Sequence, residues 1–161
     1  MKIAVVFYGY ARTIGQLINE YRMAIPKNSD IFIYTYDTFY PRSHEDIHTT
    51  TDNVTHTSLE YFENIFGKQA IKLFRTRKYN KDQYIKFIND NHLPQSNFAR
   101  QITHRTCATF DSIRLAINLK KEYEASRNFK YDCVILTRLD LQFKTPIIIP
   151  SNLNKLSYPI G

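Results

Sequence analysis

The order of the first three predicted elements constrains the fold of this chain most strongly. Lys2–Phe7 is a continuous apolar run with β-branched residues, which predicts a strand buried on both faces that stops at Gly9. From Ala11 the apolar residues follow a helical spacing until Pro26, and Asp30–Tyr36 predicts a second strand. A strand, a helix and a strand in this order favour a right-handed βαβ unit with a parallel sheet.

The rest of the chain continues this alternation. Further helices are predicted at Leu59–Phe66, Lys81–Asn91 and Asn97–Ser126, and further strands at Ala70–Phe74 and Tyr131–Thr137. In the longest helix, the expected apolar face consists of Phe110, Ile113, Ala116 and Ile117. Residues 38–58 are polar and predict a long loop. We therefore expect residues 1–161 to form a single α/β domain with three layers and a mainly parallel sheet.

The charge of the chain indicates anionic partners without choosing among them. The formal net charge of +7 attracts nucleic acid, membrane lipid and phosphorylated small molecules alike. The most basic run, Arg75–Lys81, is more typical of a solvated turn than of a nucleic-acid interface, so nucleic acid is not an expected partner. No apolar stretch approaches the roughly 20 residues that span a membrane. We expect a soluble protein in which Cys107 and Cys133 are free thiols.

The segment "HEDIH" satisfies the H-E-x-x-H pattern of zinc peptidases. In those enzymes His44 and His48 would have to lie on one face of a helix. The surrounding residues, with Pro41 before the segment and a Thr run after it, offer no apolar face to bury such a helix. A polar, exposed loop is therefore the favoured interpretation, and a zinc peptidase is the least favoured function.

Polar and charged residues follow three of the predicted strands. They are Gly9, Arg12 and Thr13 after the first strand, Asp37 after the second, and Arg138 and Asp140 after the last. Because ligands of open parallel sheets bind beyond the carboxyl ends of the strands, we expect these residues around one cleft. Gly9 lets a ligand approach the backbone, Arg12 offers a fork to phosphate oxygens, and Thr13 caps a helix or donates to phosphate.

The last strand carries opposite charges within the apolar run "YDCVILTRLDLQF", whose Val134, Ile135 and Leu136 we expect in the core. Asp140 is a candidate ligand for Mg²⁺ or Mn²⁺ shared with a diphosphate. Arg138 is instead a candidate to neutralise the same phosphates without a metal. The alternative for both residues is a surface salt bridge at the end of a strand.

Three segments together resemble a group of bacterial and viral glycosyltransferases of the GT-A type. They are "KIAVVFYGYART", "DIFIYTYD" and the pairing of "LKKEYE" with "KYDCVILTRLDL". In that group, a helix that ends in a Tyr-Glu-like pair precedes a strand that finishes in R-x-D, in the place of the D-x-D motif of nucleotide-sugar enzymes. The resemblance runs from residue 2 to about residue 147 and is strongest in the last fifty residues.

The resemblance implies binding of a nucleotide-diphosphate-sugar and transfer of its sugar to a glycan or protein acceptor, in the cytoplasm of a bacterium or of the host of a virus. Phe7, Tyr8, Gly9, Arg12, Thr13 and Asp37 would then hold the base and ribose. Arg138 and Asp140 would face the diphosphate, with Asp140 on Mn²⁺ or Mg²⁺, and they are the best candidates for a catalytic role.

Two features depart from the pattern of the group. Arg138 stands where a D-x-D motif has its first acidic residue, and Leu141–Gly161 contains no Asp or Glu that would serve as the base of an inverting enzyme. Three interpretations follow: the donor-binding half of a longer enzyme, an enzyme whose base comes from elsewhere, or a non-catalytic nucleotide-binding module on the same fold.

Overall fold

The computed structural model describes residues 1–12, 14–15, 17–39, 55–92 and 97–150. The strands are β1 (Ile3–Gly9), β2 (Asp30–Tyr36), β3 (Thr38–Phe39), β4 (Thr55–His56), β5 (Ile71–Arg77) and β6 (Cys133–Arg138). The helices are α1 (Ile18–Ala24), α2 (Leu59–Phe66), α3 (Lys81–Asp90) and α4 (Asn97–Arg127). The helices predicted at α2, α3 and α4 are confirmed to within one residue at either end.

The main sheet is four-stranded and entirely parallel, in the order β5-β2-β1-β6. This confirms the α/β fold and the parallel pairing of the first two strands. The helix between them is shorter than expected, because α1 begins at Ile18 instead of Ala11. Ile14 and Leu17 are nevertheless buried, so their apolar spacing reflects a turn packed on the core.

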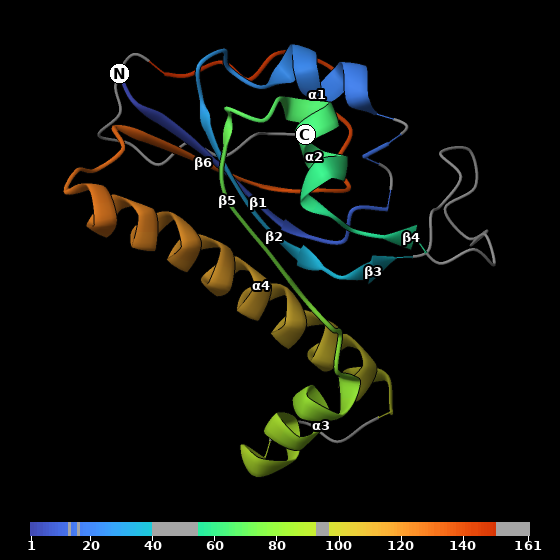
Figure 1. The fold of residues 1–161 in the computed structure, drawn as a ribbon. Coiled ribbons are helices and arrows are strands. Elements are labelled where there is room, and N and C mark those ends of the chain that lie inside the picture. Colours follow the sequence, from blue (N-terminus) through green and yellow to red (C-terminus); the bar gives the residue numbers. More distant parts are fainter. Residues whose placement is uncertain (13, 16, 40–54, 93–96, 151–161) are drawn as a thin grey trace.

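Helices cover both faces of the sheet, as Figure 1 shows. On one face, Tyr21 of α1 and Phe62 of α2 pack against Val5 and Phe7 of β1. On the other face, Ala116 and Leu119 of α4 pack against Ala4, Val6 and Phe32. The sheet is thus the middle layer of three, and its central strands β1 and β2 are apolar on both sides because helices cover both.

Two expectations about the core were wrong. Val134 and Leu136 are 44% and 41% exposed, because β6 is an edge strand and α4 packs over β1, β2 and β5. Phe110 is 67% exposed, since the face of α4 that meets the protein runs instead through Ala108, Ser112, Ala116 and Leu119. Of the predicted face, Ala116 lies in this stripe, Ile113 and Ile117 are partly buried, and Phe110 is exposed, so the predicted face is turned away from the observed one, which includes a serine.

Beyond the carboxyl end of β5, α3 packs beside the first part of α4 (Figure 1). The two helices form a wall outside the sheet. Within the predicted polar loop, β3 and β4 pair as a short antiparallel ribbon, whereas His44 and His48 lie outside the described residues. Across the described ranges, no helix has the length and apolar character to cross a membrane.

Candidate functional site

A cavity of about 840 Å³ lies at the carboxyl ends of the parallel strands. Its lining residues are Tyr8, Gly9, Tyr10, Arg12, Tyr36, Tyr79, Lys81, Ile85, His104, Arg105, Ala108, Thr109, Ser112, Arg138 and Asp140. The sheet contributes the ends of β1, β2 and β6, and α3 and α4 contribute the facing wall. Both the position and the volume are typical of small-molecule sites in open parallel sheets.

Five of the residues predicted at the strand ends line this cavity: Tyr8, Gly9, Arg12, Arg138 and Asp140. Asp37 is not among the lining residues, and its backbone amide donates to the Arg77 carbonyl over 2.9 Å. Phe7 was expected to contact the ligand, but its side chain is fully buried against Tyr21 and Phe66 and is not available to a ligand. Thr13 lies outside the described residues.

Gly9 adopts a conformation that suits an open approach to the backbone. Its φ is +90°, which side-chain-bearing residues rarely adopt, and no atom lies within 4 Å of the place a Cβ would take. The Thr35 hydroxyl donates to the Gly9 carbonyl over 2.7 Å and thereby fixes the end of β1. The backbone at Gly9 is therefore held by a hydrogen bond and open where a Cβ would lie.

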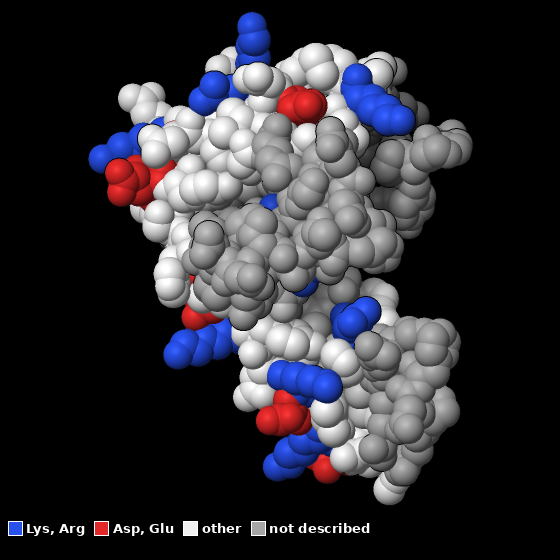
Figure 2. All heavy atoms as spheres, turned by 90° about the vertical axis from the view of Figure 1, so that its right-hand side faces the viewer, with Lys and Arg blue, Asp and Glu red and all other residues white. Residues whose placement is uncertain are grey.

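The cavity carries a strong excess of positive charge. Arg12 lies in the turn after β1, Arg138 ends β6, and Lys81 and Arg105 come from the helical wall. Among the lining residues that the structure describes, Asp140 is the one carboxylate. Lys and Arg side chains also predominate over Asp and Glu on the face shown in Figure 2. This arrangement attracts anions.

Arg138 and Asp140 neutralise each other. Arg138 Nε and Nη2 donate to the two carboxylate oxygens of Asp140 over 2.8 and 2.6 Å. The hydrogen bond to Asp140 raises the pKa of the Arg138 guanidinium. The salt bridge considered for these residues therefore exists, but it lies in the lining of the cavity.

Three tyrosine rings lie together in the lining. Tyr10 stacks on Tyr36 with the ring centroids 4.2 Å apart, and Tyr79 meets Tyr36 edge-on at 5.6 Å. The Arg12 guanidinium lies over the Tyr10 ring, 4.4 Å from its centroid. Burial raises the pKa of the Tyr10 hydroxyl well above its usual range, so the hydroxyl stays protonated at neutral pH.

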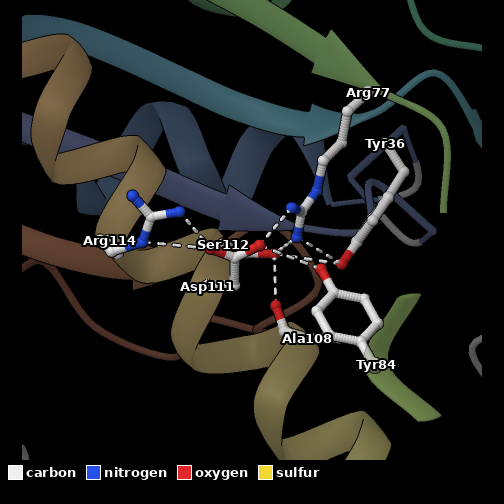
Figure 3. Close-up of polar contacts among 7 residues, drawn as sticks. All are labelled: Tyr36, Arg77, Tyr84, Ala108, Asp111, Ser112 and Arg114. Atoms are coloured by element: carbon white, nitrogen blue, oxygen red, sulfur yellow. Dashed lines mark hydrogen bonds and ion pairs between the residues drawn. The ribbon is translucent and has the colours of Figure 1, made fainter. Parts of the chain in front are cut away.

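A partly buried polar network is hydrogen-bonded to Tyr36, one of these three tyrosines (Figure 3). Arg77, at the end of β5, donates to the Tyr36 hydroxyl over 3.3 Å and to Ser112 Oγ over 3.1 Å. Its other terminal nitrogen pairs with Asp111, which also accepts from Tyr84. The network joins β2, β5, α3 and α4, so it fixes the helical wall relative to the sheet.

His104 lies in the helical wall with its ring held in place. Its Nδ1 is hydrogen-bonded to the Tyr79 hydroxyl over 2.8 Å. Burial lowers the pKa of His104, and the nearby charges of Lys81 and Arg105 lower it further. The imidazole is therefore neutral at pH 7.

None of the predicted site residues lies in the helical wall of the cavity. One signal is present in the basic run Arg75–Lys81, although its composition is more typical of a solvated turn. In the structure Arg77 is partly buried and donates to the Tyr36 hydroxyl, and Tyr79 and Lys81 line the cavity. His104 and Arg105 carried no comparable signal, because their place depends on where α4 crosses the end of the sheet.

The chain has no significant match among protein-family models, curated proteins or solved structures. These comparisons therefore assign no family to it.

Proposed function

We propose that this chain binds a nucleotide-diphosphate-sugar in the cavity and belongs to a glycosyltransferase of the GT-A type. The observation that carries the proposal is the combination of four cations and three adjoining tyrosines at the carboxyl ends of parallel strands. A diphosphate needs cationic donors, and a nucleoside needs flat apolar surface with a few polar groups at its edge. The cavity supplies both.

Within this proposal, the sheet side of the cavity takes the donor. Gly9 lets the diphosphate approach the backbone, and Arg12 supplies a charged fork that the Tyr10 ring holds in place. Arg138, at the end of β6, is in register with Tyr8 of the adjacent strand β1 and lines the same cavity. Tyr10 and Tyr79, which are only partly buried, offer aromatic surface to the base, whereas Tyr36 is buried behind them.

A divalent cation fits this site only in a limited way. In the described part of the chain there is no group of three or more side chains suited to hold a metal, and both oxygens of Asp140 already accept from Arg138. A single carboxylate suits Mg²⁺ or Mn²⁺ that shares its coordination with the phosphates of a bound donor. In that role Asp140 would hold the cation, and the cation would neutralise diphosphate charge.

The second candidate function is a non-catalytic nucleotide-binding module. It is favoured by the pairing of Asp140, since both oxygens of the one carboxylate among the described lining residues already accept hydrogen bonds from Arg138. Binding and catalysis are distinguished by turnover. An enzyme hydrolyses its donor slowly to free nucleotide without an acceptor, whereas a binding module leaves the donor intact.

The first experiment is a thermal-shift panel of uridine, guanosine and adenosine diphosphate sugars, each with and without Mn²⁺. A donor at about 100 times its Kd stabilises the fold by roughly 2.7 kcal/mol. We expect at least one donor to raise the Tm of the wild-type chain and to lose most of this effect in Arg12→Gln.

The matched control is Lys86→Gln, which removes one charge from an exposed residue of α3 that does not line the cavity. It should respond to the donor as the wild type does. If no donor of the panel shifts the wild-type Tm, or if both variants lose the shift equally, the proposal is wrong. Incubation of the responding donor with the protein, followed by chromatography for free nucleotide, then decides between enzyme and binding module.

A further inference from the structure

The cationic residues of the cavity fall into two groups on facing walls. Arg12 follows β1 and Arg138 ends β6, whereas Lys81 and Arg105 belong to α3 and α4. Tyr10 contacts Arg12 and lies 6.2 Å from Tyr79, measured between ring centroids. The aromatic group therefore adjoins both sets of charges.

The helix-side group is a cluster built around a fixed imidazole. Lys81 and Arg105 lie close enough to His104 for their charges to act on its ring. The hydrogen bond to the Tyr79 hydroxyl orients that ring, and Tyr79 is itself packed against Tyr36 and Tyr84. Two like charges beside a neutral imidazole repel each other, and a bound anion relieves that repulsion.

A single diphosphate does not account for both groups. Within the proposed function, the donor uses the sheet side, where the backbone at Gly9 is open and Arg12 is held over Tyr10. The helix side then keeps two cations that no carboxylate among the described lining residues neutralises, since Asp140 pairs with Arg138. Such an excess is typical of a site for a second anion.

We propose that Lys81, Arg105 and His104 form a second anion subsite, which binds a phosphate group carried by the acceptor substrate. Phosphate fits this cluster better than carboxylate because its greater charge and three oxygens match two cations and a ring nitrogen. The assignment of the anion to an acceptor rests on the proposed function. The binding of phosphate to the cluster does not.

The test follows the ring signals of His104 by NMR in the isotopically labelled full chain while inorganic phosphate is added. We expect a saturable shift in the wild type and in Arg12→Gln. In Lys81→Gln/Arg105→Gln, the Kd for phosphate should rise at least about tenfold, because each removed cation takes away a charge-assisted hydrogen bond.

The control variant is Lys86→Gln/Lys121→Gln, which changes the net charge equally at exposed positions of α3 and α4 that do not line the cavity. Its phosphate affinity should stay within about twofold of the wild type, because a charge outside the cavity acts only through screened solvent. Amide spectra of both double variants should retain the dispersion of the wild type.

The decisive titration is repeated with a nucleotide-sugar at saturation. The proposal expects phosphate to bind at His104 with a similar Kd in its presence. It is overturned if the nucleotide-sugar displaces phosphate, if no saturable shift occurs, or if the two double variants lose phosphate equally. If no nucleotide-sugar binds at all, the proposed function fails, and the titration without it still decides whether the subsite exists.

Discussion

At the scale of single residues, the two charges at the end of β6 form a salt bridge with each other and also line the cavity. Arg138 grips Asp140 with two hydrogen bonds, yet its own side chain is half exposed. Exposed ion pairs contribute only about 0 to 1 kcal/mol to stability, and this pair is open to solvent on its Arg138 side. The pair is therefore easily opened by a ligand that offers phosphates to Arg138 and a cation to Asp140.

Asp140→Ala tests this view of the pair. We expect the variant to lose the Mn²⁺-dependent part of nucleotide-sugar binding, because the cation loses its protein carboxylate. In the presence of a chelator it should bind the donor at least as well as the wild type, since Arg138 is released. Calorimetric titration with and without Mn²⁺ measures both effects.

The Tm of unliganded Asp140→Ala should barely move, because the pair lies at the surface of the cavity. Arg138→Ala is the companion variant, and it should weaken donor binding with or without Mn²⁺. Equal donor affinity in the wild type and in both variants would mean that the pair only closes the end of a strand.

At the scale of elements, the decisive feature is which strands α4 covers. Val134 and Leu136 share register with Ala4 and Val6 of β1, so they belong to the same face of the sheet. Ala4 and Val6 are fully buried beneath α4, whereas Val134 and Leu136 are exposed. On this face of the sheet, α4 therefore covers β1, β2 and β5 and leaves β6 exposed.

The same substitution at two leucines measures this asymmetry. Leu119→Ala, on the face of α4 that packs on the sheet, should lower the free energy of unfolding by about 2 to 5 kcal/mol. Leu136→Ala should cost less than about 1 kcal/mol, because much of its side chain is already in water. Urea denaturation of both variants provides the comparison, and similar losses would show that α4 or another segment covers β6.

At the scale of the whole molecule, two partly or fully buried carboxylates tie α4 to the rest of the fold. Burial alone would raise the pKa of Asp111, but hydrogen bonds from Arg77 and Arg114 outweigh it and lower that pKa. Glu124 behaves in the same way, since its bonds to Lys120 and to the Tyr131 amide outweigh burial. Both carboxylates therefore prefer the charged form in the folded chain.

This preference makes stability depend on pH. A carboxylate with a lowered pKa in the folded state stabilises the fold above its unfolded pKa, about 3.9 for Asp and 4.3 for Glu, and loses that contribution as pH falls through the folded value. We expect stability to decline below about pH 4. Glu124→Gln should cost roughly 2 to 4 kcal/mol at pH 7, because it leaves Lys120 without its buried partner.

The cost of Glu124→Gln should shrink as the pH is lowered toward 2, where the wild-type carboxyl is also neutral. Urea denaturation across this range measures the change. Glu122→Gln is the matched control, since Glu122 pairs with Arg75 where both side chains are about half exposed, and it should cost less than about 1 kcal/mol. A constant cost of Glu124→Gln at every pH would contradict the prediction.

The sequence by itself determined the parallel α/β fold and much of the sheet side of the cavity. Apolar runs, helical spacing and turn residues act over a few neighbouring positions. The positions of β1, β2 and most helices can therefore be predicted from the sequence. Parallel strands bring their carboxyl ends to one edge of the sheet. The sequence alone therefore predicts that one cleft contains Gly9, Arg12, Arg138 and Asp140, and all four line the cavity.

Only the tertiary structure decided the burial of single side chains and the other half of the cavity. Phe7 lies in the core instead of the site, and Leu136 is exposed, because burial depends on which strand is central and which is at the edge. Lys81, His104 and Arg105 reach the cavity only because the Arg77 network fixes α3 and α4 beside the sheet. These contacts join residues far apart in the chain, and no local pattern of residues encodes them.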